Sequence, residues 1–487
     1  MILRVFGHSF HYECENLCRV FFPNEKISIL YDYSGEESKE VITVYDNGGI
    51  TVTANIDGAS KTLTSNASYE NAELEIARLI FFILCDITSY TPPWGVLTGV
   101  RPSKLMMKLI SEEGEEEAKR YFTERLLVSE EKTNLTCMVA NAESDIVNSA
   151  TPESFSLYVS IPFCPTRCSY CSFVSHSISN PAAKKMIIPY VDNLVSEIKL
   201  SSYYASSLGL KLESIYFGGG TPGILEPAQF DTIQSTIEEC IDLSDLREYT
   251  VEIGRPDTVT PEKLNVLKLH NVDRISINPQ TFSQKTLDII GRKHTPEDTV
   301  KAYRLAKSYG FRCINMDLIA GLPGEKLRDF SDSLDTCISL SPENITVHTL
   351  ALKRSSEMNY EGETVNDGKE AEKMLAYAKD RLTNSGYSPY YMYRQSKCVG
   401  NLENVGWTKP GYEGFYNVIM MEECHTVIGV GAGSVTKLCE PGGTNVERIF
   451  NYKFPYEYIS GFDVIRDRKK GIADFYNSLK SPGKDEV

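Results

Sequence analysis

The stretch that decides the fold is SLYVSIPFCPTRCSYCSF, residues 156–173. It begins with an apolar run typical of a buried strand and continues into a loop that carries Cys164, Cys168 and Cys171. This CxxxCxxC spacing offers three thiolates from one loop, and iron–sulfur clusters prefer soft thiolate ligands. A [4Fe-4S] cluster bound by three cysteines leaves one iron open to another ligand. The segment therefore predicts a strand that ends in a metal-binding loop.

The open iron indicates the chemistry. S-adenosylmethionine (SAM) can chelate such an iron through its amino and carboxylate groups, and one-electron transfer then breaks a C–S bond to give a 5′-deoxyadenosyl radical. A structural zinc site is the alternative, but zinc normally takes four ligands, and His176 is the only near candidate for the fourth. We therefore favour the iron–sulfur cluster.

A second motif, FGGGTP at residues 217–222, follows another apolar run. Glycines lack Cβ atoms and let the backbone approach a ligand closely, although a triple glycine alone indicates only a turn. One βα unit after the cysteine loop, the motif matches the segment that holds the methionine amino group of SAM in radical SAM proteins, which this sequence resembles. The two motifs together predict a radical SAM site.

From residue 155 onward, short apolar runs alternate with helical patterns, as is typical of βα units around a parallel sheet. The predicted strands are SLYVSI, LESIYF, YTVEIG, DRISIN, CINMDLIA and NITVHTL. Six such units predict an α/β fold with a partial (β/α)6 barrel. In such barrels the functional residues gather where strands end. Those ends hold the cysteine loop, the triple glycine, Glu252, Gln280 and Asp317.

The chain divides into three predicted regions. Residues 1–150 are expected to form an N-terminal α+β region of unknown role, with antiparallel strands in KISILYDYS and VITVYDNGGITVTANI and a helix in NAELEIARLIFFILCDIT. Residues 151–385 are expected to form the barrel. Residues 386–487 mix aromatics and glycines, and we expect a C-terminal accessory or substrate-lid domain there.

Composition limits the classes of function. The chain has 487 residues, of which 41% are hydrophobic and 24% charged, as expected of a folded enzyme with more than one domain. A net charge of −16 disfavours nucleic acid as a partner. The sequence shows no membrane span and no signal peptide, and its thirteen cysteines are too irregular for a disulfide framework. We expect a cytoplasmic protein.

Further residues narrow the resemblance to the oxygen-independent coproporphyrinogen III dehydrogenase (HemN/HemW-like) family of radical SAM proteins. The likeness is carried by Tyr158, GGGTP, Glu252 in VEIGRPD, Gln280 and Arg292 in NPQTFSQKTLDIIGRKH, and Asp317 in MDLIAGLP. The strings GVLTGVRPSK, GRPD, IGRKHT and ENVGWTKPG resemble the HemZ-type branch.

The resemblance implies how the site residues would act. Tyr158 would join the cluster cysteines and contact the cluster-bound SAM. The methionine moiety would contact Gly219, Gly220 and Thr221; the ribose and carboxylate would contact Glu252, Gln280, Arg292 and Asp317; and the adenine would contact Phe173, Ile319 and Ala320. The implied cofactors are the [4Fe-4S] cluster and one or two SAM molecules.

The implied reaction is the oxidative decarboxylation of two propionates of coproporphyrinogen III, which gives protoporphyrinogen IX for haem biosynthesis. An electron donor such as flavodoxin or ferredoxin would supply the cluster. A tetracarboxylate substrate needs cationic anchors. The candidates just past the predicted strand ends are Arg255, Lys293, His294, Lys353 and Arg354, each of which could equally be a surface cation.

Two positions depart from the family pattern. The best-defined dehydrogenases have a further cysteine where this chain has Phe173, and a histidine where it has Ser160. Related haem chaperones also lack that cysteine, so haem carriage with His348 or His425 as an axial ligand is an alternative. A radical SAM methyltransferase, or another tetrapyrrole-modifying enzyme, is a further alternative.

Overall fold

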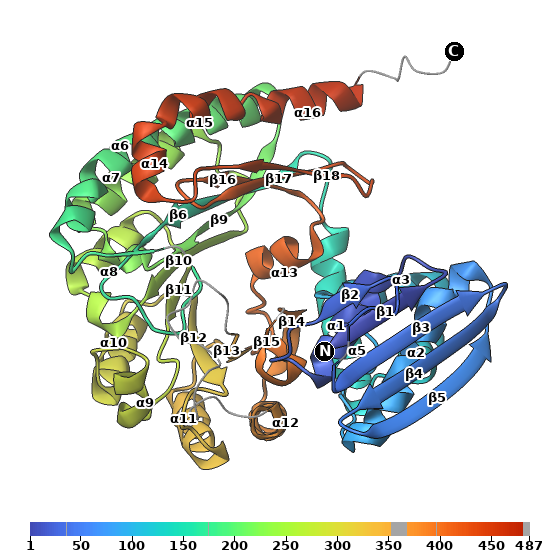
Figure 1. Ribbon diagram of the computed structural model, residues 1–487. Helices are drawn as coiled ribbons and strands as arrows, with labels where there is room; N and C mark the ends of the chain where they lie inside the picture. Colours follow the sequence, from blue (N-terminus) through green and yellow to red (C-terminus); the bar gives the residue numbers. More distant parts are fainter. Residues whose placement is uncertain (36, 174, 352–367, 396, 481–487) are drawn as a thin grey trace. The chain divides into compact units, whose positions relative to one another are not determined.

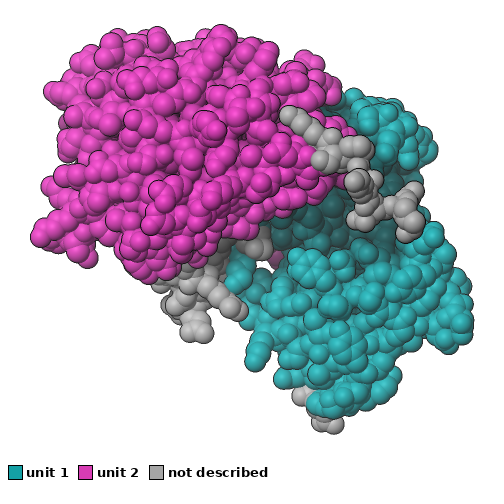
Figure 2. Space-filling view, turned by 90° about the horizontal axis from the view of Figure 1, so that it is seen from above, with its two compact units in different colours: residues 1–141, 392–403 teal, residues 142–391, 404–487 magenta. Residues whose placement is uncertain are grey.

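The computed structural model describes residues 1–35, 37–173, 175–351, 368–395 and 397–480 (Figure 1). The chain forms two compact units (Figure 2). Unit 1 comprises residues 1–141 and 392–403, and unit 2 comprises residues 142–391 and 404–487. The chain therefore leaves unit 2 once, contributes twelve residues to unit 1, and returns.

Unit 1 is built on a five-stranded sheet with the order β2-β1-β3-β4-β5. Its strands are β1 (Ile2–Phe6), β2 (Ser28–Leu30), β3 (Lys39–Asp46), β4 (Gly49–Ile56) and β5 (Ala59–Asn66). Its helices are α1 (His11–Phe21), α2 (Tyr69–Thr88), α3 (Pro102–Glu113), α4 (Glu115–Arg120), the π-helical turn η1 (Tyr121–Arg125) and the first part of α5 (Glu130–Asn148). Helix α2 packs against β4 and β5, and α1 lies beside α2.

The predicted hairpin and the predicted helix of the N-terminal region are confirmed. Strands β3 and β4 pair antiparallel through a turn at Asn47 and Gly48, both with positive φ, as expected for an Asn-Gly hairpin turn. The strand predicted in KISILYDYS is confirmed only for Ser28–Leu30, and the predicted antiparallel pairing is wrong, because this strand pairs parallel with β1. The buried Arg4 guanidinium donates to the carbonyls of Asp32, Ser34 and Gly35, which draws these residues out of the sheet.

Unit 2 is built on a sheet with the order β14-β15-β13-β12-β11-β10-β9-β6-β16-β17-β18. The parallel strands β6 (Ser154–Ile161), β9 (Lys211–Gly219), β10 (Glu248–Gly254), β11 (Arg274–Ile277), β12 (Cys313–Ala320) and β13 (Asn344–Thr349) confirm all six predicted strands. The helices between them are α6 (Pro181–Ser207), α7 (Pro227–Cys240), α8 (Pro261–Leu269), α9 (Gln284–Ile289), α10 (Pro296–Ser308) and α11 (Leu327–Leu340). Helix α12 (Gly368–Asn384) follows β13, and the predicted α/β barrel core is thereby confirmed.

The two faces of this sheet differ sharply in polarity. In β6 the side chains of Phe155, Leu157 and Val159 are fully buried, whereas Ser156 and Tyr158 alternate with them on the other face. Figure 1 shows helices α6, α7, α8, α10 and α11 outside the curved sheet, against its apolar face. The polar face therefore lines the lumen of the barrel.

The remaining strands extend the sheet at both ends. Strand β15 (Glu403–Thr408) pairs antiparallel with β13 and follows β14 (Ser388–Arg394) and the short η4 (Val399–Asn401). Beyond β6 lie β16 (Thr426–Val430), which is parallel to it, and the antiparallel β17 (Val435–Cys439) and β18 (Val446–Phe450). Helices α14 (Pro455–Ser460), α15 (Phe462–Arg468) and α16 (Gly471–Lys480) pack against α6. The predicted functional borders at residues 150 and 385 stay predictions.

Helix α13 (Phe415–Glu422) closes the amino-terminal end of the lumen. Glu248 on β10 accepts the backbone N–H groups of Phe415 at 2.7 Å and Tyr416 at 3.1 Å. Arg274 on β11 lies 3.2 Å from the same carboxylate and balances its charge. Helix α13 therefore covers the lumen at the amino-terminal end of the strands. Among the described helices, none combines the length and the apolarity needed to cross a membrane.

Candidate active site

The two ends of the cysteine loop pair with each other. Strand β7 (Phe163–Cys164) pairs with β8 (His176–Ser177), so the chain returns to the first cysteine thirteen residues later. Cys171 N–H donates to the carbonyl of Cys168 at 3.0 Å, which makes a tight turn between the second and third cysteines. The loop therefore gathers all three thiols at the carboxyl end of β6.

The three thiols influence one another electrostatically. Burial raises the pKa of Cys171 to about 11, and charge on Cys168 and Cys164 adds to the shift. Burial also raises the pKa of Cys164, with Cys168 again contributing. Metal binding would stabilise the thiolates that burial disfavours. Within the described residues no three His, Cys, Asp or Glu side chains could hold a single metal ion. Three thiolates on one loop match the ligand set that an iron–sulfur cluster takes.

The triple glycine clamps the start of the cysteine loop. Gly220 N–H donates to the carbonyl of Ile161 at 2.9 Å, and Thr221 N–H donates to that of Phe163 at 2.8 Å. A Cβ atom on Gly220 would lie 2.6 Å from the Phe163 oxygen, which real structures do not tolerate. Gly219 has a φ of +105°, a conformation that favours glycine. These two glycines are therefore required by the backbone itself.

Two carboxylates face the lumen above a group of stacked tyrosines. Tyr216 donates a hydrogen bond to Glu252, and its ring stacks on Tyr416 at 4.3 Å and on Tyr158 at 6.3 Å. Burial raises the pKa of Glu252 to about 7, and the charge of Asp317 adds to this shift. Tyr158, Tyr216, Glu252 and Asp317 are all half-buried, so this part of the lumen is accessible to a ligand.

Asp317 is stabilised as a carboxylate. Burial opposes its ionisation, but hydrogen bonds and charge from His348, with further hydrogen bonds from Asn315 and Thr346, keep the pKa of Asp317 below its usual value. Asn315 donates to one carboxylate oxygen at 2.7 Å, and His348 Nε2 lies 3.6 Å from the other. The lumen therefore holds one carboxylate that is ionised and another that titrates near neutral pH.

A row of polar side chains on and after β11 carries unpartnered atoms. Ser276 Oγ, Asn278 Oδ1 and Gln280 Oε1 are buried and have no hydrogen-bond partner among the described residues. Gln280 also has a positive φ of 67°, and its backbone bonds to that of Asp317 and Ile319. Strained backbone and buried orphan acceptors are costly, and they are often found where a ligand completes the site. These residues fit a bound SAM.

Arg292 lies against the cysteine loop. Its guanidinium donates to the carbonyl of Asn278 at 2.5 Å and to the hydroxyl of Tyr170 at 3.5 Å. Cys168 is one of the groups that raise the pKa of Arg292, together with Tyr170, against the opposing effect of burial. Among the predicted adenine contacts, Phe173 is 64% exposed, whereas Ile319 and Ala320 are buried.

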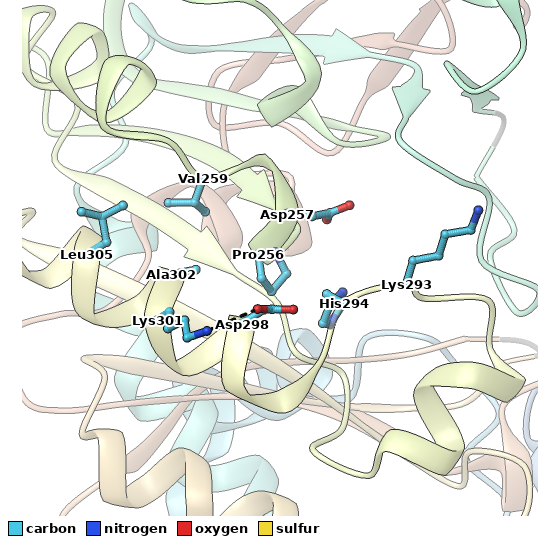
Figure 3. A pocket seen from close by; sticks show the side chains of 9 residues that line it. All are labelled: Pro256, Asp257, Val259, Lys293, His294, Asp298, Lys301, Ala302 and Leu305. Carbon is cyan, nitrogen blue, oxygen red and sulfur yellow. Dashed lines mark ion pairs between the residues drawn. The ribbon is translucent and has the colours of Figure 1, made fainter.

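The predicted substrate anchors have varied surroundings. Arg255 is buried and donates to both oxygens of Asp257 and to Thr166. Burial and the neighbouring guanidinium groups lower the pKa of His294 to about 4, so this side chain is neutral near pH 7. His294 and the exposed Lys293 line a pocket of about 330 Å³ beside α10 (Figure 3). Lys353 and Arg354 lie outside the described residues.

The two candidate haem ligands lie at opposite ends of the barrel. His425 precedes β16, and its Nε2 lies 2.8 Å from Ser156 Oγ at the amino-terminal end, away from the cysteine loop. Burial lowers the pKa of His425 to about 3. His348 faces the lumen beside Asp317. His176, the candidate fourth zinc ligand, lies in β8 with its ring edge toward Phe454 and Tyr456.

Sequence reasoning missed four residues of the lumen: Tyr216, Ser276, Asn278 and Tyr416. Ser276 and Asn278 lie two and four residues before Gln280, and Tyr216 lies two residues before Gly218. Side chains two residues apart on a strand face the same side, so this alternation could have identified three of the four. Tyr416 comes from a helix that follows the barrel by more than sixty residues, and no local pattern places it there.

The parallel barrel sheet and the three-cysteine loop at the end of its first strand define a class, the radical SAM proteins. The family model described as the Radical SAM superfamily matches residues 158–337. The chain is also similar to a solved structure, that of coproporphyrinogen III oxidase (HemN) from Escherichia coli, described as a radical SAM enzyme. The TM-score is 0.53 at 21% identity, over 67% of this chain and 73% of the other, which supports the fold.

Relatives identify the particular family. Over 479 residues the chain is 35% identical to the oxygen-independent coproporphyrinogen-III oxidase-like protein HemZ of Bacillus subtilis (strain 168), covering 94% of both chains. It is 28% identical to the heme chaperone HemW of Escherichia coli (strain K12), over 63% of this chain and 76% of the relative. The chain therefore belongs to the HemN/HemW/HemZ-type family of radical SAM proteins.

Proposed function

We propose that this protein catalyses the oxygen-independent oxidative decarboxylation of coproporphyrinogen III to protoporphyrinogen IX. The observation that carries the proposal is the three-cysteine loop at the carboxyl end of β6, on a barrel whose lumen contains the half-buried Glu252 and Asp317. The name of the HemZ relative supports the class of substrate. A [4Fe-4S] cluster, SAM, and an external one-electron donor such as flavodoxin or ferredoxin are part of the proposal, and a cytoplasmic location stays a prediction.

In this proposal Cys164, Cys168 and Cys171 bind the cluster. When bound, the cluster and SAM would supply one-electron reduction and hydrogen-atom abstraction, here from the β-carbon of a propionate, which would then lose CO₂ and pass one electron to an external one-electron acceptor. The methionine moiety of SAM would contact the backbone of Gly219, Gly220 and Thr221.

The lumen side chains orient the rest of SAM. Asp317, as a carboxylate, would accept hydrogen bonds from the ribose hydroxyls, and Gln280 would offer a further acceptor. Glu252 retains a proton until near neutral pH, because burial and the charge of Asp317 outweigh the hydrogen bond from Tyr216. Tyr158 would contact SAM from β6. Arg292 donates to the carbonyl of Asn278 and to the hydroxyl of Tyr170 beside the cysteine loop.

Haem carriage is the second candidate, favoured by the heme chaperone HemW among the relatives. A chaperone would bind haem without changing it. The position of His425 at the far end of the barrel makes it a poor ligand for haem held near the cysteine loop, which ranks this function below decarboxylation.

The test is an anaerobic assay. The protein, with its cluster reconstituted, is mixed with SAM, a reductant and coproporphyrinogen III, and the mass of the porphyrin is followed together with 5′-deoxyadenosine. We expect loss of two CO₂ per porphyrin, with deoxyadenosine formed in step. The variant Cys168→Ala should form neither product and should lack the charge-transfer absorbance of the cluster.

The other outcomes discriminate between the alternatives. Deoxyadenosine without a change in the porphyrin would refute the substrate, and a gain of one methyl group would indicate a methyltransferase. Stoichiometric haem binding without SAM cleavage would indicate that the protein is a haem chaperone.

A further inference from the structure

His348 lies on β13 at a lumen position that the cluster chemistry does not explain. Its side chain faces Asp317 on the neighbouring strand β12, with 3.6 Å between Nε2 and the carboxylate. Only 26% of the side chain is exposed, so the contact is shielded from water. An ion pair in such a setting is screened far less than one on the surface.

Asn404 on β15 fixes the imidazole from the other side. The Asn404 Oδ1 atom accepts the backbone N–H of Thr349 at 2.9 Å, so this atom is an acceptor rather than the amide nitrogen. His348 also hydrogen-bonds to the Asn404 side chain. A neighbouring carboxylate favours the protonated form of an imidazole. The bonds to Asp317 and Asn404 and the charge of Glu252 accordingly raise the pKa of His348, although burial opposes this.

Asp317 is therefore held at both oxygen atoms. Asn315 donates to Oδ1 at 2.7 Å, and the amide oxygen of Asn315 in turn accepts from Thr346 at 3.1 Å. His348 faces Oδ2. The carboxylate has one orientation, and its remaining lone pairs are directed to the lumen.

Charge balance gives His348 a second effect. Glu252 and Asp317 face the same lumen, and the charge of Asp317 disfavours ionisation of Glu252. Among the described residues, His348 supplies a positive charge that lowers the pKa of Glu252. The tyrosines around this cluster, namely Tyr158, Tyr216, Tyr391 and Tyr416, have pKa values raised by burial and are neutral at physiological pH.

We propose that His348, held by Asn404, is a positioning residue for SAM binding that fixes Asp317 as an oriented carboxylate for the ribose hydroxyls. The inference rests on the proposed function only in that SAM binds in this lumen; it does not depend on the identity of the second substrate. His348 itself need not touch SAM, since its contacts are to protein groups.

The experiment measures the affinity for SAM of the anaerobic, cluster-loaded full chain by equilibrium dialysis. His348→Gln keeps a hydrogen-bonding side chain and removes the charge. We expect about tenfold weaker binding of SAM, which corresponds to roughly 1.4 kcal/mol. The iron content should stay unchanged, because His348 does not contact the cysteine loop. His425→Gln is the matched control, another buried histidine at the opposite end of the barrel, and should bind SAM like the wild type.

A double-mutant cycle distinguishes positioning from a general loss of structure. In an Asp317→Asn background, His348→Gln should weaken SAM binding by less than twofold, because the group that it positions is already gone. A SAM analogue that lacks the ribose 2′-hydroxyl should likewise bind wild type and His348→Gln with similar affinity.

Unchanged SAM affinity in His348→Gln would overturn the inference, as would the same tenfold loss with Asp317→Asn already present. Either result, obtained with a wild-type protein that binds and cleaves SAM, leaves the proposed function intact. A wild type that binds no SAM would instead overturn both. A wild type that cleaves SAM without altering coproporphyrinogen III would overturn only the proposed substrate.

Discussion

Gly220 shows how closely a single residue can determine the site. Its backbone bonds to the carbonyl of Ile161, and any Cβ atom would collide with backbone atoms of the loop that begins at Phe163. Rigid backbone cannot yield as a flexible side chain can. A methyl group at Gly220 would therefore displace the backbone that positions Cys164.

We predict that Gly220→Ala loses at least about half of its cluster iron and becomes less stable by roughly 2 kcal/mol or more. Gly218→Ala is the matched control, because its Cβ would meet only the rings of Tyr216 and Tyr158, at 3.1 and 3.2 Å. Iron per chain after identical anaerobic reconstitution is the measurement. Equal iron content in the two variants would show that the backbone contacts of Gly220 do not determine whether the cysteine loop binds its cluster.

Glu252 is predicted to make stability depend on pH. Burial raises its pKa to about 7 from an ordinary value of 4.5. At a pH between these two pKa values, the Glu252 carboxyl group is ionised in the unfolded chain but still protonated in the folded chain. The contribution of Glu252 to the free energy of unfolding therefore falls as pH rises. Relative to Glu252→Gln, the ligand-free wild type should lose roughly 1–3 kcal/mol between pH 5 and pH 8. Denaturant melts of both proteins at the two pH values test this, and parallel pH profiles would contradict it.

At the scale of elements, the parallel strands could be predicted because each of them lies between a covering helix and the polar lumen. Apolar side chains alternate with polar ones in β6, and turns and helices separate the runs, so pattern and structure agree. The carboxyl end of strand β2 could not be predicted, because Arg4, a residue far away in the sequence, binds the carbonyls of Asp32 and Ser34 that follow this strand. Strands β16 to β18 join the barrel sheet through pairing with β6, more than 250 residues earlier. No local pattern encodes such a partner.

The buried pair of Lys469 and Glu197 joins the C-terminal helices to α6. Both side chains are fully buried, 3.1 Å apart, and Glu197 also accepts from Tyr458 and Asn451. Removing one partner leaves an uncompensated buried charge, which costs about 3–5 kcal/mol. We therefore predict a loss of this size for Lys469→Met in denaturant unfolding.

The adjacent Lys470 provides the control for this prediction. It forms an exposed ion pair with Asp467 at 2.9 Å, and such pairs contribute at most about 1 kcal/mol. Lys470→Met should therefore unfold almost like the wild type. Similar losses in the two variants would mean that burial does not decide the strength of these pairs.

At the scale of the whole molecule, the sequence predicted the barrel fold, whereas contacts between residues that lie far apart in the chain could not be predicted. The cysteines and the triple glycine are contiguous motifs, whereas the contacts of His348 depend on three strands brought together by the fold. The same holds in unit 1, where residues near position 400 complete the core. Glu403 there accepts from Lys132 at 2.6 Å and from the buried Trp94 at 2.8 Å.

Each unit contains one of the two tryptophans, which allows the units to be followed separately. In a Trp407→Phe background, Glu403→Gln should shift the unfolding transition reported by Trp94 by roughly 3 kcal/mol, because Lys132 loses its buried partner. Lys469→Met, which alters unit 2, should leave that transition in place. A shift of the Trp94 signal in both variants would show that the units unfold as one.

The return of residues 392–403 to unit 1 has a consequence during synthesis on the ribosome. Residues 1–141 emerge first, but the segment that carries Glu403 follows only after 250 further residues. At about 5–20 residues per second, this delay is roughly 10–50 s. Through that interval Lys132 lacks its carboxylate and Trp94 lacks its acceptor. The nascent N-terminal unit therefore stays incomplete while the barrel is synthesised. During this time we expect it to bind a chaperone that shields exposed apolar surface.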